Sequence, residues 1–87
     1  ERDRESITAN LGRSAGNGHR VLEALYYRPI MTVADVQELI GTTYQAANTL
    51  VRRLEELGVL EEITGYARNR RYRYGAYVRL FSEGTEN

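Results

Sequence analysis

The sequence contains no cysteine, which excludes disulfide bonds and cysteine-ligated metal sites. It contains one histidine, His19, which almost entirely excludes histidine-paired nucleophiles and multi-histidine metal sites. No apolar run approaches the roughly 20 residues that span a membrane, and no stretch has the layout of a signal peptide. We therefore expect a cytoplasmic chain that has no cofactor, metal or small-molecule substrate and does not contact a membrane.

Lysine is also absent, so all twelve basic residues are arginine. Arginine favours bidentate contacts to phosphate and carboxylate groups, although a GC-rich genome would give the same bias. The net charge is zero, but the charges are unevenly distributed. Segment 42–64 carries two arginines and four glutamates, whereas segment 65–82 carries five arginines and no acidic residue. The neutral total counts against strong binding to nucleic acid, and the local basic segment favours it.

The 87 residues, 41% of them hydrophobic, fit one small globular domain. Residues 1–18 are expected to be a linker or helical lead-in, with a short helix carrying Ile7 and Leu11 on a narrow apolar stripe. The glycine-rich residues 15–18 are expected to form a flexible loop that leads into a helix over 19–27, which Pro29 ends. The domain proper is predicted over 19–82, followed by a polar tail at 83–87.

Two further helices follow in close succession. Thr32 and Asp35 have capping-box spacing at the start of a helix that Gly41 ends, with Val33, Val36, Leu39 and Ile40 as its buried stripe. Thr43 opens the next helix, whose apolar stripe consists of Ala47, Leu50, Val51, Leu54 and Leu57. Because the joint between them is so short, the two helices must cross steeply, as in a helix-turn-helix.

Residues 59–64 and 70–74 are predicted to be two strands of a hairpin. Ile30 and Met31 could add a third strand, and residues 76–81 a last helical turn or strand. Strand alternation places Tyr72 and Tyr74 on the core side with Ile63, and Arg71 and Arg73 on the other side. The predicted fold is mainly α with a small β-hairpin, a winged helix-turn-helix in which the hairpin is the wing.

The outward face of the second helix of the pair and the wing are the candidate nucleic-acid site. Asn and Gln can pair bidentately with adenine, Arg can pair with guanine, and wing arginines can contact phosphate. The same residues would also suit an ordinary solvated face, where Glu55 and Glu56 dilute the positive field. The candidates are Thr43, Gln45, Asn48, Thr49, Arg52, Arg68, Asn69, Arg70 and Arg71.

Other chemically suggestive groups favour simpler interpretations. The Gly16-Asn17-Gly18 triplet has no preceding strand, so it is not expected to cradle phosphate. His19 is expected to be an exposed or half-exposed helix residue. The glutamates of 55–62 are expected to be solvated rather than catalytic, because acid–base chemistry needs a cleft that shifts the pKa.

The string from residue 29 to 81 resembles the C-terminal winged-helix domain of Fic/DOC family proteins, over roughly residues 19–82. The resemblance rests on three motifs: the helix end Leu54, Leu57, Gly58, Val59 and Leu60; the segment Glu62, Ile63, Thr64 and Gly65 with Arg68, Asn69, Arg70, Tyr72 and Tyr74; and the tail Tyr77, Val78, Leu80 and Phe81. It implies a parent protein that transfers AMP, or another nucleotide phosphate moiety, from a nucleotide to a target hydroxyl. Residues 1–18 would then connect the domain to an absent catalytic core.

The catalytic motif of that family, H-P-F-x-[DE]-G-N-G-R, does not occur in this chain. Gly16, Asn17 and Gly18 repeat three of its letters, but no His-Pro-Phe precedes them and His19 replaces the arginine. We therefore expect no enzymatic activity from this chain. Two functions are left open: a DNA-binding regulatory module whose partner is double-stranded DNA, or a protein-interaction module that forms a homodimer or packs on the Fic core.

Overall fold

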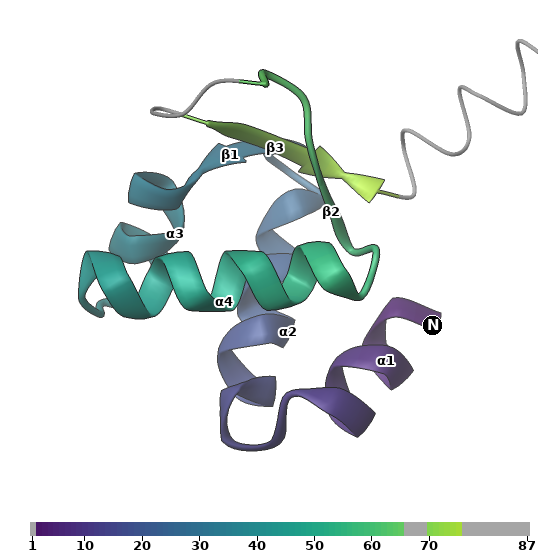
Figure 1. Ribbon diagram of the computed structural model, residues 1–87. Helices are drawn as coiled ribbons and strands as arrows, with labels where there is room; N and C mark the ends of the chain where they lie inside the picture. Colours follow the sequence, from purple (N-terminus) through teal and green to yellow (C-terminus); the bar gives the residue numbers. More distant parts are fainter. Residues whose placement is uncertain (1, 66–69, 76–87) are drawn as a thin grey trace, which may run out of the picture.

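The computed structural model describes residues 2–65 and 70–75, which form a helical layer beneath a small sheet (Figure 1). Four α-helices, one 3-10 turn and three strands occupy the described residues. In chain order they are α1 (Arg2–Asn10), η1 (Gly12–Ser14), α2 (Ala15–Leu25), β1 (Ile30–Thr32), α3 (Val33–Ile40), α4 (Tyr44–Glu56), β2 (Leu60–Glu62) and β3 (Arg71–Tyr74). The predicted winged helix-turn-helix is confirmed. No helix within the described residues has the length and apolar character needed to cross a membrane.

Local signals in the sequence define the helix pair α3 and α4. Thr32 and Asp35 form the predicted reciprocal capping box at the start of α3. Gly41 ends α3 in the left-handed conformation, at φ 65°, which glycine adopts without a Cβ clash. Thr43 then caps α4, because its hydroxyl oxygen accepts a hydrogen bond from the Ala46 amide. The tight joint therefore forms as predicted.

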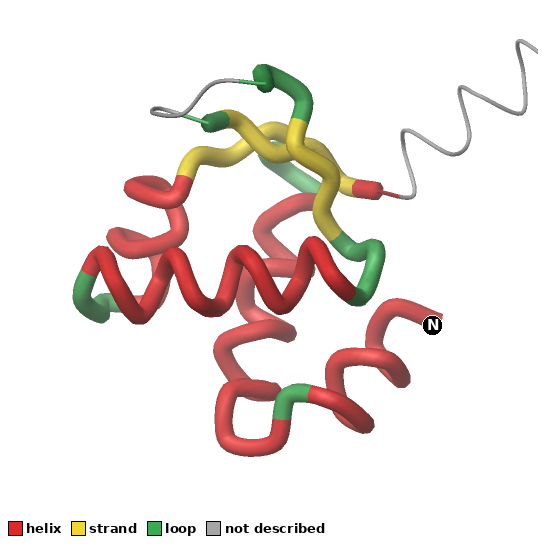
Figure 2. The backbone as a smooth tube through the Cα atoms, in the orientation of Figure 1, coloured by secondary structure: helices red, strands yellow, loops and turns green. Residues whose placement is uncertain are grey.

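The three strands form one antiparallel sheet in the order β1-β3-β2 (Figure 2). Tyr72 of β3 lies opposite Met31 of β1 and Glu62 of β2. The tyrosine is only 2% exposed, so it closes the sheet onto the helices as the alternation predicted. Ile30 and Met31 do supply the third strand.

The core also includes residues from the segment expected to be a lead-in. Ile7 and Leu11 are buried, at 0% and 3% exposure, in the same cluster as Leu22, Leu25 and Leu54. The short helix expected in residues 1–13 is confirmed as α1. The expected boundary between residues 18 and 19 falls inside α2. Residues 2–18 pack onto the rest of the domain, because Ile7 and Leu11 lie in its core.

Three expectations were wrong in whole or part. Residues 15–18 do not form a loop but make the first turn of α2. Gly18 is buried there, and a Cβ on it would lie 2.8 Å from Leu11 Cδ1 and 2.9 Å from Ile7 Cγ2, so α1 and α2 cross where only a hydrogen fits.

Ile63 points away from the core and is 39% exposed, because β2 pairs with β3 in a register that turns Leu60 inward. Leu39 and Ile40 of α3 are only partly buried.

Candidate nucleic-acid interface

Helix α4 presents the predicted polar stripe on its outer side. Its inner face is buried through Ala47, Leu50, Val51 and Leu54. Gln45, Thr49 and Arg52 are exposed on the opposite side, and Asn48 is half-buried beside them. These four positions follow the spacing of one helix face, so the structure brings them together.

Two of the candidates on α4 have local structural roles as well. Thr43 is exposed but uses its side-chain oxygen to cap the helix. The Thr49 hydroxyl donates to the Gln45 carbonyl at 3.0 Å, one turn earlier. Gln45, Asn48 and Arg52 therefore carry the functional groups on this stripe that are best placed to contact a ligand.

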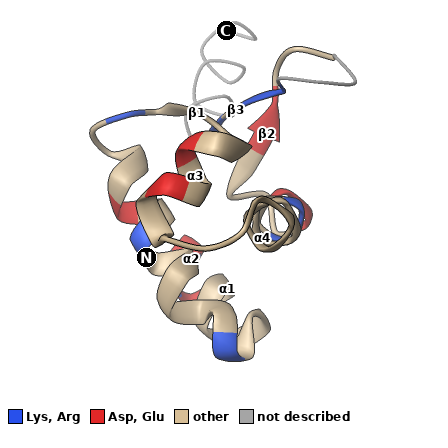
Figure 3. Cartoon of the chain, turned by 90° about the vertical axis from the view of Figure 1, so that its left-hand side faces the viewer, with Lys and Arg blue, Asp and Glu red and all other residues tan. Residues whose placement is uncertain are grey.

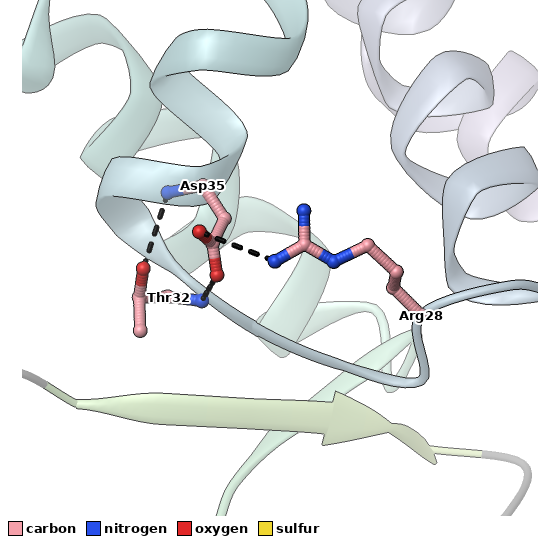
Figure 4. A network of polar contacts seen from close by, with 3 residues as sticks. All are labelled: Arg28, Thr32 and Asp35. Carbon is pink, nitrogen blue, oxygen red and sulfur yellow. Dashed lines mark hydrogen bonds and ion pairs between the residues drawn. The ribbon is translucent and has the colours of Figure 1, made fainter.

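A polar network holds the start of α3, the helix that precedes this stripe (Figure 4). The Thr32 amide donates to the Asp35 carboxylate at 2.9 Å, and the Asp35 amide donates to the Thr32 hydroxyl at 3.1 Å. Arg28 lies 3.4 Å from the other carboxylate oxygen of Asp35. The Thr32 amide, and less strongly the Thr32 hydroxyl and Arg28, hold the pKa of Asp35 below its ordinary value. The cap stays ionised at neutral pH and fixes α3 against β1.

The wing contributes its arginines at the start of β3. Arg70 and Arg71 are exposed, while Arg73 is half-buried and faces Glu61 across the ladder. The candidates Arg68 and Asn69 lie outside the described residues. The described part of the wing therefore exposes Arg70 and Arg71.

Glu62 closes the strand end that leads into the hairpin. Its carboxylate accepts hydrogen bonds from the Thr64 hydroxyl at 2.6 Å, the Thr64 amide at 2.9 Å and the Gly65 amide. The Thr64 hydroxyl, followed by the Gly65 amide, lowers the pKa of the Glu62 carboxyl. Glu62 is thus a hydrogen-bond acceptor that stabilises the strand end. The expectation that the glutamates of 55–62 are solvated holds for Glu55, Glu56 and Glu61, which are exposed.

Acidic and basic residues alternate around this surface. Figure 3 views the side of the molecule where α4 begins, and both colours occur on α4 and on the sheet above it. Arg53 is directed elsewhere, because its guanidinium donates to the Asn10 carbonyl at 2.9 Å. The exposed arginines here are Arg52 on α4 and Arg70 and Arg71 on the wing, and the exposed Glu55 and Glu56 follow Arg52 on the same helix.

Tyr44 was missed among the candidates. It is the first residue of α4, and its side chain is 55% exposed. An aromatic ring at the start of the helix that would enter a groove can pack on a sugar or a thymine methyl. The available signal was its place directly after the Thr43 cap and outside the Ala47-Leu50-Val51-Leu54 stripe.

His19, which was expected to be chemically quiet, lies on α2 and contacts α1. The His19 ring Nε2 lies 2.9 Å from the Thr8 hydroxyl, and the side chain is half-buried as expected. Among residues 2–65 and 70–75 no three His, Cys, Asp or Glu side chains gather closely enough to hold a metal ion.

Comparison with known proteins places the sequence in one family. The profile of the MarR family matches residues 16–68, which run from the first turn of α2 into the hairpin. The match spans more than half of the chain. No curated protein matches the chain.

Proposed function

The chain belongs to the MarR family, and we propose that it is a regulatory module that binds double-stranded DNA through α4 and the wing. The observation that carries this proposal is the polar stripe of Gln45, Asn48, Thr49 and Arg52 on the outer side of the second helix of a tightly joined pair. A polar stripe in this place is what a recognition helix presents to base edges.

The stripe and the wing suit different parts of a duplex. Gln45 and Asn48 have amides that can pair with adenine in the major groove, and Arg52 can reach guanine or a phosphate. Arg70 and Arg71 would contact the backbone beside the groove, with Arg68 and Asn69 proposed as further wing contacts. The base contacts would specify sequence, whereas the arginines would set most of the affinity.

Salt dependence of duplex binding tests the proposal. A fluorescein-labelled duplex of random sequence, titrated at about 50 and 200 mM salt, should bind far more weakly at the higher concentration. Arg52→Ala and Arg71→Ala should each weaken binding and lower the slope of log K against log salt by about 0.9, one phosphate each.

Arg13→Ala is the matched control for these variants. It removes the same charge from an exposed residue of η1, outside the helix pair and the sheet. Equal losses from all three variants would indicate a general effect of net charge. A wild-type chain that leaves the duplex unbound at about 50 mM salt would overturn the DNA proposal.

A protein-interaction module is the second candidate, and exposed apolar residues favour it. Ile30 and Ile63 lie on the outer side of the sheet at 41% and 39% exposure, and Tyr27 is 85% exposed at the end of α2. Apolar residues in such positions are common at contacts between proteins. Sedimentation at rising concentration tests self-association, and a chain that stays monomeric while it binds duplex would count against this candidate.

A finer proposal is that the module serves a Fic-like AMP transferase, with residues 1–18 as the connection to the catalytic core. It is supported by the resemblance of the hairpin and tail motifs, whereas the family match supports only the winged helix. The coding sequence upstream of Glu1 tests it directly. An open reading frame without the H-P-F-x-[DE]-G-N-G-R motif would rule out this proposal and leave DNA binding untouched.

A further inference from the structure

Helix α1 reaches both of the elements proposed to contact DNA. At its C-terminal end, the Asn10 carbonyl accepts a hydrogen bond from the Arg53 guanidinium of α4 at 2.9 Å. At its N-terminal end, the Asp3 carboxylate accepts one from the Tyr74 hydroxyl of β3 at 2.8 Å. One helix of 9 residues thus joins the recognition helix to the wing strand across 71 positions of sequence.

The hydrogen bond between Asp3 and Tyr74 involves a tyrosine that its neighbours hold in place. Leu60 of β2 lies opposite Tyr74 in the ladder, and the Tyr74 amide donates to the Pro29 carbonyl at 3.0 Å. The Tyr26 ring stands edge-on to the Tyr74 ring, with centroids 6.0 Å apart. Burial, followed by the hydrogen bond to Asp3, raises the pKa of the Tyr74 hydroxyl, so this group remains a donor to the carboxylate.

Because of the position of Tyr74 in β3, the hydrogen bond to Asp3 can affect where Arg71 lies. Tyr74 is the last residue of β3, and Arg71, the wing arginine, is the first. The two Cα atoms are about 10 Å apart at the usual rise of a strand. In Figure 1 α1 lies on the side where α4 and β3 end, opposite the side where α4 and β3 begin. A small rotation at Tyr74 would therefore displace Arg71 relative to the start of α4.

Helix α1 is itself fixed firmly enough to act as a reference. Ile7 and Leu11 are buried in the common core, and Gly18 of α2 allows α1 to approach closely. The hydrogen bond between Asp3 and Tyr74 therefore connects the wing to the core on which α4 also packs, through Leu54.

We propose that α1 positions the wing relative to the recognition helix, with Asp3 and Tyr74 as the positioning pair. The inference rests on the DNA-binding function proposed above and adds two residues that would not touch DNA. The wing arginines contact phosphate with full effect only when the base of β3 is held at the correct angle to α4.

Tyr74→Phe is the most direct test, because it removes only the hydroxyl. This variant should bind the same labelled duplex about three- to tenfold more weakly at about 50 mM salt. The slope of log K against log salt should fall by an amount that corresponds to about one to two phosphate contacts. Asp3→Ala should act alike, and the double variant should be no weaker than either single one, because both remove the same bond. Ser14→Ala is the control, since it also removes one hydroxyl, and the Ser14 side chain caps neither η1 nor α2.

Hydrogen exchange separates positioning from a loss of overall stability. The Ile63 amide donates to the Arg71 carbonyl across the hairpin, so it reports on the wing without DNA. In Tyr74→Phe the Ile63 amide should exchange faster, while α4 amides such as Leu54 keep their protection. Equal acceleration of the Ile63 and Leu54 amides would show that Asp3 and Tyr74 only stabilise the fold, and it would overturn the inference.

The binding outcomes are also distinct. A wild-type chain that binds duplex, with an unchanged slope in Tyr74→Phe, overturns the inference alone. A wild-type chain that binds no duplex overturns the proposed function and the inference together.

Discussion

Gly16 and Gly18 lie two residues apart in α2 but in opposite surroundings. A Cβ on Gly16 would meet nothing within 4 Å, whereas one on Gly18 would lie under 3 Å from Ile7 and Leu11. Gly16→Ala should therefore stabilise the fold by up to about 1 kcal/mol through helix propensity. Gly18→Ala gains the same propensity but overpacks the crossing, at a cost of about 1–3 kcal/mol.

Urea unfolding of the two glycine variants measures this difference. The expected order of stability is Gly16→Ala, wild type, Gly18→Ala. If Gly18→Ala were as stable as Gly16→Ala, the Leu11 and Ile7 side chains would have moved aside freely, and the crossing of α1 and α2 would not be tight.

Residue-level prediction worked best where the signal was local. Thr32 with Asp35, Thr43, and Gly41 all took their expected places, because capping and left-handed glycine depend on a few adjacent residues. Ile63 did not, because the face on which it lies depends on strand register, and register is fixed by pairing with distant residues. Gly18 was misjudged for the same reason, since its neighbours Ile7 and Leu11 lie in another helix.

At the scale of elements, the cap of α3 gives a pH-dependent prediction. The folded-state pKa of Asp35 lies below its ordinary value of 3.8. The stability from this carboxylate is therefore fully present above pH 3.8 and is lost as the pH falls through the lower, folded-state pKa. Asp35→Ala should cost about 1 kcal/mol at pH 7, and its difference from wild type should shrink below about pH 4.

Urea unfolding at neutral and acidic pH measures the loss, with Thr32→Ala as the contrast. The Thr32 hydroxyl accepts from the Asp35 amide and does not itself titrate, although it helps to lower the pKa of Asp35. Thr32→Ala should therefore cost about 1 kcal/mol at pH 7 and keep more of this cost at acidic pH than Asp35→Ala does. A loss in Asp35→Ala that did not change with pH would show that the carboxylate charge contributes nothing to the cap.

The site was easier to predict at the scale of elements than in its electrostatics. The apolar stripe of α4 identified its inner side and so its outer side, which placed Gln45, Thr49 and Arg52 correctly. The sequence could not show that Arg53 would be held by the Asn10 carbonyl, a contact across 43 residues. Nor could it show that Arg73 would face Glu61 across the ladder.

At the scale of the whole molecule, α1 packs on the same core as the other helices. It supplies Ile7 to the core, the next residue Leu11 is buried beside it, and α1 contacts α4 and β3 through Asn10 and Asp3. The family match begins at residue 16, after α1, so the matched segment leaves out a helix that packs on the core through Ile7. A helix attached at the edge of a winged domain can thus carry part of its stability even where the shared family pattern does not include it.

Removal of α1 should therefore weaken the whole fold. A fragment that begins at residue 12 keeps α2 intact but lacks both buried side chains, and we expect it to lose cooperative thermal unfolding. Ile7→Ala in the full chain should cost about 2–5 kcal/mol, a large share of the 5–15 kcal/mol typical of a domain. Ala9→Ser, on the exposed side of α1, is the matched control and should change stability by less than about 0.5 kcal/mol. If the fragment melted cooperatively at the temperature of the full chain, α1 would be a lead-in attached to a domain complete without it.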